Sequence, residues 1–256
     1  GASPIMDICF ILAGVMLEFG TYGLVRCAFQ MTPEALAQAG QVILAFGVVS
    51  ALYGAFAALA QSDLKKMIAY TSVNHMGYVV IGVAVAALAA EPRIRVIGFD
   101  GATLQMVSHG LVTGALFFLV GMLQDRAHER DMSNFGGLLG RVPWLGWAFI
   151  LSAFASLGLP GLAHFPAEFQ VFLATLNTAP WAIVAILAIV VTAALYLRAI
   201  AAVFLGSPNP KWAEMPDLDR REKAAILPLL VLTVLVGVAP GWLIDLIHTT
   251  MTGLAN

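Results

Sequence analysis

The chain has 256 residues, of which 60% are apolar and 11% are charged, with a formal net charge of −2. Ordinary soluble domains carry about 25% charged residues, so a soluble domain of this composition would lack the charge to cover its exterior, whereas lipid can serve as that exterior. The near-neutral charge excludes any expectation of nucleic acid or a strongly acidic partner. The composition therefore predicts an integral membrane protein.

The apolar runs predict the spans, because a helix needs about 20 apolar residues to cross the hydrocarbon. The runs do not alternate as transmembrane strands do, so we expect an all-α, polytopic bundle that forms a single membrane domain over residues 1–256. By length we expect about seven spans, at 5–26, 41–61, 67–90, 101–124, 144–176, 181–205 and 224–247.

Small residues recur inside the first two expected spans. Gly14, Gly20 and Gly23 lie in the first span, and Gly47 and Gly54 lie in the second. Small side chains let helix backbones approach closely in lipid, where no hydrophobic force drives helix association. We therefore expect these glycines at helix–helix contacts.

The cysteines and the first residues give little further information. Cys9 and Cys27 are too few for a disulfide framework, and each lies in or beside an apolar run, where Cys usually behaves as a small hydrophobic residue. The chain opens Gly-Ala-Ser-Pro, without an initiator Met or a basic region. This predicts no signal peptide and indicates a fragment or a processed product.

The loop charges test the span assignment independently. If the spans alternate, three of the 13 basic residues fall on one side: Arg26, Arg93 and Arg95. The other ten fall on the opposite side: Lys65, Lys66, Arg126, Arg130, Arg141, Arg198, Lys211, Arg220, Arg221 and Lys223. Basic residues are enriched in cytoplasmic loops, which predicts residue 1 on the cytoplasmic side and the carboxy terminus outside.

The fifth expected span is too long for one straight crossing. Residues 144–176 are apolar, and Pro160, Gly161 and Pro166 lie in their middle. Proline removes a backbone donor and clashes with the preceding turn. We expect a helix that stops near Leu159 and resumes by about Pro166, as in the interrupted helices at transporter ion sites. The alternatives are a tight hairpin of two short helices or a packing kink.

Five ionisable residues fall inside the expected spans: Glu18, His75, His109, His164 and Glu168. Such residues are costly in lipid and usually face a bundle interior or a hydrated path. Imidazole has both a donor and an acceptor nitrogen, so two or more His with carboxylates favour a proton relay. The alternative is structural: a satisfied interhelical hydrogen bond for each His, and an ion pair or a neutral hydrogen-bonded acid for Glu18. His128 and His248 are expected at the interface.

Motifs for other chemistry are not found in the sequence. We find no phosphate-binding glycine loop, no zinc spacing, no iron–sulfur cysteine run and no haem attachment motif. We therefore expect neither a cofactor nor a metal, and no redox chemistry in this chain.

Several strings resemble the antiporter-like subunits of NADH–quinone oxidoreductase (respiratory complex I). Residues 63–78 are similar to the most recognisable segment of that family, and their His-Met-Gly ending resembles the M type (mitochondrial chain 4) rather than the L or N types. Residues 105–111 and 125–138 continue in the family's order, and residues 160–169 resemble its broken-helix motif. The resemblance covers nearly the whole chain.

By this resemblance the family has fourteen helices in two inverted five-helix repeats, and the chain corresponds to about the last seven. Residues 12–26 resemble the family's eighth helix, where Glu18 stands in place of the usual Lys. His164 and Pro166 also differ from the small or amide residues that are usual at their positions. We expect Glu18 to be a neutral acid whose polar partners are His75, His109 or water rather than a basic side chain.

The resemblance implies a proton-translocating M-type subunit in the bacterial inner membrane, with a relay through Glu18, His75, His109, His164 and Glu168. Its partners would be the other membrane subunits of complex I and the lipid bilayer, and electron transfer would take place in partner subunits. One alternative is a subunit of a cation/proton antiporter or of a membrane-bound hydrogenase, which share the fold. Another is a structural remnant that packs in a complex without moving protons.

Overall fold

The computed structural model describes residues 16–29 and 31–255, and almost all of its regular structure is helical. The longer helices are α3 (Pro33–Leu59), α4 (Leu64–Leu88), α5 (Pro92–Ala127), α6 (Pro143–Ser156), α7 (His164–Thr178), α8 (Leu187–Val203), α9 (Arg220–Val238) and α10 (Gly241–Ala255). The shorter ones are α2 (Leu17–Gly23), the π-helical η2 (Leu24–Phe29) and the 3₁₀ turns η3 (Met132–Asn134), η4 (Leu138–Gly140), η5 (Pro180–Ile186) and η6 (Pro210–Trp212). The all-α prediction is confirmed for this part of the chain.

The expected spans agree with the structure in part. Within the described residues, four helical segments are long and apolar enough to cross a membrane: α3, α4, α5 and the continuous segment Pro180–Val203. Helices α9 and α10 add a fifth if they are taken as one span, although they are bent by 77°. Part of the first expected span, including Cys9 and Gly14, lies outside the described residues.

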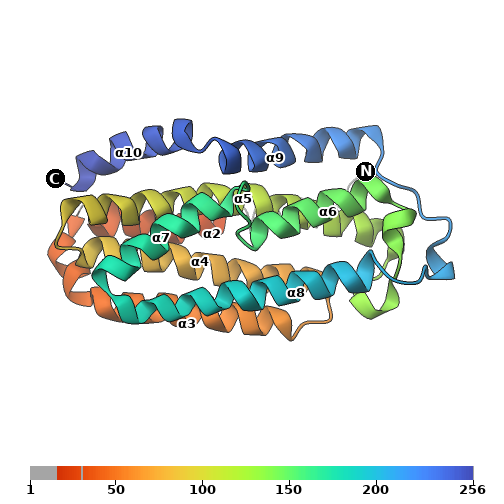
Figure 1. Ribbon diagram of the computed structural model, residues 1–256, viewed down its shortest axis with the longest axis horizontal. Helices are drawn as coiled ribbons and strands as arrows, with labels where there is room; N and C mark the ends of the chain where they lie inside the picture. The colour runs from red at the N-terminus through yellow and green to blue at the C-terminus, as the bar shows by residue number, and fades with distance from the viewer. Residues whose placement is uncertain (1–15, 30, 256) are drawn as a thin grey trace.

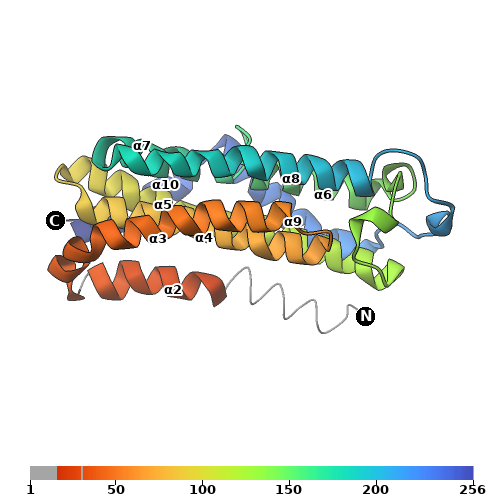
Figure 2. The same cartoon turned by 90° about the horizontal axis from the view of Figure 1, so that it is seen from below.

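Helices α4 and α5 form the centre of the bundle. Helix α4 packs against α3, α5 and α7, and α5 also packs against α6, α9 and α10. The helices run along one common long axis (Figure 1), and α2 lies on one side of the bundle (Figure 2). Most residues of α4 and α5 are buried, so polar side chains on these two helices are shielded from lipid.

Glycine permits the close contact between α3 and α4. A Cβ added at Gly47 or Gly54 would clash with the backbone of α4, and one added at Gly77 would lie 2.5 Å from the backbone nitrogen of Ala51. The prediction for Gly47 and Gly54 is confirmed. The prediction for Gly20 and Gly23 is wrong within the described structure, because a Cβ at either position would meet nothing within 4 Å.

The basic loops meet at one end of the bundle. The Leu64 N–H donates to the Arg130 carbonyl at 3.0 Å, and the Gly137 N–H donates to the Leu205 carbonyl at 2.8 Å. Arg126 forms an ion pair with Glu222 at the start of α9. The loops that follow α3, α5 and α8 therefore lie together at one end of the molecule (Figure 1).

The fifth expected span is broken, as predicted. Helix α6 ends at Ser156 and α7 begins at His164, so the interruption starts earlier than expected and Pro166 lies in the first turn of α7. Proline is tolerated there because its missing N–H would have no helical partner. Gly158 and Gly161 adopt φ angles of 77° and 91°, in the left-handed region that glycine enters readily.

Protein covers the irregular backbone of this break. A Cβ at Gly237 of α9 would clash with the backbone of Gly161 and Leu162, so α9 lies directly against the break. From the other side, the Ser108 hydroxyl of α5 donates to the Ala163 carbonyl at 2.8 Å. Non-helical backbone at membrane depth is tolerated only where protein or a water-filled cavity covers it, and this arrangement meets that requirement.

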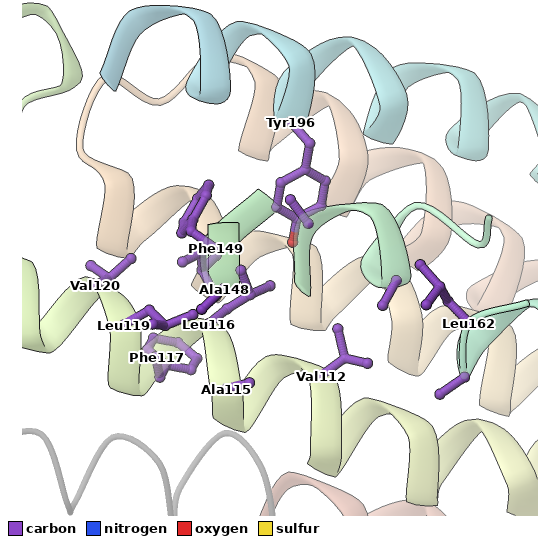
Figure 3. Close-up of a cluster of buried hydrophobic side chains, with 14 of the residues drawn as sticks. Val112, Ala115, Leu116, Phe117, Leu119, Val120, Ala148, Phe149, Leu162 and Tyr196 are labelled. Carbon is purple, nitrogen blue, oxygen red and sulfur yellow. The ribbon is translucent and has the colours of Figure 1, made fainter. Parts of the chain in front are cut away.

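An apolar core adjoins the break. Leu116 and Leu119 of α5 pack with Ala148 and Phe149 of α6 in one buried cluster, and Figure 3 shows these side chains between the two helices. Tyr196 reaches into the same region from α8 (Figure 3). The core holds α6 in place up to the residue at which the helix ends.

Residues 224–247, expected as one straight span, contain a sharp bend. Helix α9 ends at Val238, α10 begins at Gly241, and Pro240 lies between them. Proline disfavours helical conformation in the residue before it, which explains the interruption at Ala239. The bend follows Gly237, so the two broken helix pairs contact each other near their interruptions.

We expect Gly77→Ala to destabilise the protein, because the new methyl group would meet the rigid backbone of α3. Overpacking of this kind costs about 1–3 kcal/mol. The thermal unfolding midpoint of the purified chain in detergent should fall. Gly140→Ala is the matched control, since a Cβ there meets nothing within 4 Å. Equal midpoints for both variants would show that the α3–α4 contact is looser than described.

Candidate functional site

The structure brings all five predicted ionisable residues into one connected region. Glu18 lies on α2, His75 on α4, His109 on α5, and His164 and Glu168 on α7. The three His and Glu168 are buried, and Glu18 is partly buried. We call this set the polar axis.

Helical spacing fixes two members of the polar axis. His164 begins α7 and Glu168 follows four residues later, so both side chains lie on the same face of that helix. The short interruption after Ser156 aims this face at α4 and α5, against which α7 packs. The break motif thus positions a His and a Glu together.

Glu18 and His109 form one end of the polar axis. His109 Nδ1 lies 3.4 Å from Glu18 Oε1, so the expectation that Glu18 has a His partner is confirmed. Glu18 also lines a cavity of about 310 Å³. The other residues that line this cavity are Phe19, Tyr22, Thr103, Met106 and Val107.

His75 lies at the centre. Its ring centroid is 6.0 Å from that of His109 and 4.4 Å from that of His164. Its Nε2 lies 3.0 Å from Ser156 Oγ, and its Nδ1 lies 3.5 Å from the amide nitrogen of Gln105. His75 therefore contacts both the α5 side and the α7 side of the axis.

Glu168 forms the other end, against the break. Its Oε1 lies 3.7 Å from His75 Nδ1, and a Cβ at Gly158 would clash with its Oε2. The glycine at the break therefore makes the space that the carboxyl group occupies. Carboxyl group and interrupted backbone lie side by side, as the sequence predicted.

Sequence reasoning missed the hydroxyl groups that support His75. Tyr196 of α8 donates to Ser156 Oγ at 2.8 Å and lies 3.3 Å from Thr71 Oγ1. Ser156 and Tyr196 both lie inside apolar runs, where a single hydroxyl group gives no periodic signal. The signal available was the position of Ser156 directly before the break.

A second buried carboxyl group was also missed. Asp100 of α5 is buried, and its Oδ2 lies 2.7 Å from Nδ1 of His248 on α10. The expected span began at residue 101, which placed Asp100 at its edge. His248 was expected at the interface, and its side chain is exposed as is that of His128, but it also pairs with this buried acid.

The polar axis suits proton transfer chemically. Each imidazole can accept a proton on one nitrogen and release one from the other, and three of them connect two carboxyl groups. The gap of 3.7 Å between His75 Nδ1 and Glu168 Oε1 is longer than a hydrogen bond, so a small side-chain movement would close it. His75, His164 and Glu168 are also the described residues that offer a cluster of metal-ligand atoms.

Comparison with known proteins gives the same family. The protein-family model described as "NADH:quinone oxidoreductase/Mrp antiporter, TM" matches residues 2–195. NADH-quinone oxidoreductase subunit M of Pseudomonas aeruginosa is 37% identical over 244 residues, which are 95% of this chain and 46% of that protein. The chain thus spans about half the length of the curated relatives it matches.

Two solved structures are similar. A chain of respiratory complex I from Thermus thermophilus has a TM-score of 0.84 and 31% identity, over 93% of this chain and 49% of that one. A chain of the Mrp complex from Dietzia sp. has a TM-score of 0.86 over 98% of this chain and 54% of that one. Its 21% identity shows a shared fold alone.

The matched region contains all five residues of the polar axis and the break between α6 and α7. The chain belongs to the NADH:quinone oxidoreductase/Mrp antiporter transmembrane family.

Proposed function

We propose that this chain is the carboxy-terminal half of an M-type, proton-translocating subunit of NADH–quinone oxidoreductase. The observation that carries the proposal is the polar axis: five ionisable side chains that connect α2 to the broken helix through the buried centre of the bundle. Buried ionisable residues are costly in lipid and mark ion or proton pathways. The 37% identity to a subunit M over 95% of the chain supports the proposal that the chain is part of this complex.

The path we propose runs from Glu18 through His109 and His75 to Glu168, with His164 beside the last step. A proton on Glu18 reaches His109 across 3.4 Å. From His75 it passes to Glu168, whose Oε1 lies 3.7 Å from His75 Nδ1. Water completes the steps that exceed hydrogen-bond length.

Glu168 acts as the terminal group. Its carboxyl lies against Gly158 in the break, where backbone carbonyls that are not used in a helix can hold water. We infer that protons leave the polar axis here, toward one side of the membrane or toward a neighbouring subunit. Electron transfer takes place in partner subunits, and the other membrane subunits of the complex are the expected partners.

We also propose seven spans in one membrane domain, in the bacterial inner membrane. The described spans, the broken α6–α7 pair, the bent α9–α10 pair and the helix that contains α2 together make seven crossings. The basic loops that meet at one end of the bundle support that end as cytoplasmic. Residue 1 then lies on the cytoplasmic side and the carboxy terminus lies outside.

The alternative of a cation/proton antiporter subunit is favoured by one observation, the fold shared with a chain of an Mrp complex. The two functions differ in the transported ion. Proteoliposome assays of the assembled complex with a sodium gradient, in parallel with a proton gradient, separate them.

We expect Glu168→Gln to abolish proton conduction, because the amide cannot release a proton. The chain in proteoliposomes with an internal pH dye should show a rate lower by about tenfold or more, since a positioned acid or base contributes at least that much. Glu214→Gln is the control, because that carboxylate is exposed in a loop. A wild-type rate no higher than that of protein-free liposomes would support a structural role instead.

Glu18→Gln is expected to be nearly silent for stability, because the amide keeps the shape and hydrogen bonding of a neutral acid. It should nevertheless remove conduction through the polar axis. Infrared spectra of the wild type should contain a protonated-carboxyl band that this variant loses and that Glu34→Gln keeps. An ionised Glu18 near neutral pH would contradict the neutral-acid assignment and would require a cation beside it.

Reporter fusions at residues 215 and 256 should report opposite compartments. Residue 215 comes after η6, at the end of the bundle where the basic loops meet, and residue 256 comes after the bent pair α9–α10. Reports from one compartment would show that α9 and α10 return to the same side instead of crossing together.

A further inference from the structure

We propose that His75, His164 and Glu168 form a binding site for a divalent transition-metal ion, zinc by its ligand chemistry. Each side chain offers a ligand atom, and these atoms all lie within 4.8 Å of one another. Two imidazoles and one carboxylate are a ligand set that zinc accepts. Spacing along the sequence gave no zinc motif, because His75 comes from α4 and the other two ligands from α7.

The hydrogen bonds of the two imidazoles leave lone pairs for an ion. His164 Nδ1 lies 3.3 Å from the Ser156 carbonyl, which can only accept, so Nδ1 carries the proton and Nε2 carries a lone pair. That Nε2 is buried and has no hydrogen-bond partner among the described protein atoms. With His75 Nε2–H donating to Ser156 Oγ, the lone pair of His75 Nδ1 lies toward Glu168, and an ion there displaces the long 3.5 Å contact from the Gln105 amide nitrogen.

One ligand pair, His75 and Glu168, is close to the spacing of a bound ion, whereas the ligand atoms as a set lie within 4.8 Å of one another and must draw closer. Zinc bonds of about 2.0–2.1 Å in tetrahedral geometry place ligand atoms about 3.3 Å apart. The separation of 3.7 Å between His75 Nδ1 and Glu168 Oε1 needs to close by only a few tenths of an ångström. The remaining coordination position is left to water.

Supporting contacts hold the ligands in position. Ser156 bonds both His75 and Tyr196, and its carbonyl holds His164. Partners of this kind orient metal-ligating imidazoles and raise their basicity. Gly158 leaves room for the carboxyl group on the other side. The three ligands are therefore gathered in one place before an ion arrives.

Charge sets a condition for the binding step. Glu168 binds the ion as a carboxylate, so coordination releases any proton that it holds, and the carboxylate offsets one of the two positive charges. A bound ion would occupy the lone pairs that proton transfer needs. Zinc should therefore block conduction, a consequence that rests on the proposed function, whereas binding itself does not.

The test measures zinc binding by the full chain in lipid nanodiscs, in competition with a chromogenic chelator. We expect the wild type to bind one zinc ion, and His164→Ala and Glu168→Gln each to lower the affinity by about tenfold or more. His128→Asn is the control, since it removes an exposed imidazole and Asn tolerates the left-handed φ of 50° found there. Cobalt as a probe should give the intense visible absorption of a four-coordinate ion in the wild type and in His128→Asn, and should not give it in His164→Ala or Glu168→Gln.

His164→Cys guards against loss of folding, because it restores a ligand and should retain binding that His164→Ala loses. Equal affinity in the wild type, His164→Ala and Glu168→Gln would overturn the site. Loss of binding in His164→Cys together with a retained thermal midpoint would do the same. Zinc binding without any effect of Glu168→Gln on conduction would refute the proposed function and leave the metal site standing.

Discussion

The hydrocarbon interior of a membrane offers no water to polar groups, and the arrangement of this protein follows from that constraint. A helix satisfies its own backbone, but the break between Ser156 and His164 and the side chains of the polar axis cannot satisfy themselves. Helices α4 and α5 carry His75 and His109 in the centre of the bundle, and α9 covers the break through Gly237. The glycines that bring α3 onto α4 serve the same purpose, because they close the lipid-facing side of the helix that carries His75.

Local sequence features predicted the helices and the break, because these depend on residues that are neighbours in the chain. Length and apolarity located the helices, and Pro160 with Gly161 located the break within a few residues. The start of α7 at His164 agrees with the expectation that the helix resumes by about Pro166, since proline fits the first turn of a helix. Glu18, His75, His109, His164 and Glu168 were identifiable because an ionisable residue inside an apolar run is rare in itself.

Tertiary contacts could not be predicted from the same signals. Gly20 and Gly23 look like Gly47 and Gly54 in the sequence, yet only the second pair faces a neighbouring helix in the described structure. The pairing of Asp100 with His248 joins residues of α5 and α10 that are far apart in the chain. Ser156 of α6 bonds His75, and Tyr196 of α8 in turn donates to Ser156. Which of several similar residues meets a partner depends on how the helices rotate against one another.

Two of the three departures from the family resemblance, Glu18 and His164, lie at opposite ends of the polar axis and change its character together. Glu18 replaces the usual Lys with a carboxyl group that lies 3.4 Å from His109 Nδ1, and His164 adds an imidazole beside His75 and Glu168. An axis with a Lys at one end and a Glu at the other can balance its own charge. An axis with a carboxyl group at each end and neutral imidazoles between them cannot, so at least one acid must hold a proton, or a cation must enter. The added His164 supplies one further basic nitrogen where that proton or cation would lie. The carboxyl group at Glu18 leaves the axis without a fixed cation, and His164 offers a place for the proton or cation that the axis then needs. The two departures are therefore linked by charge, although they lie far apart in the sequence.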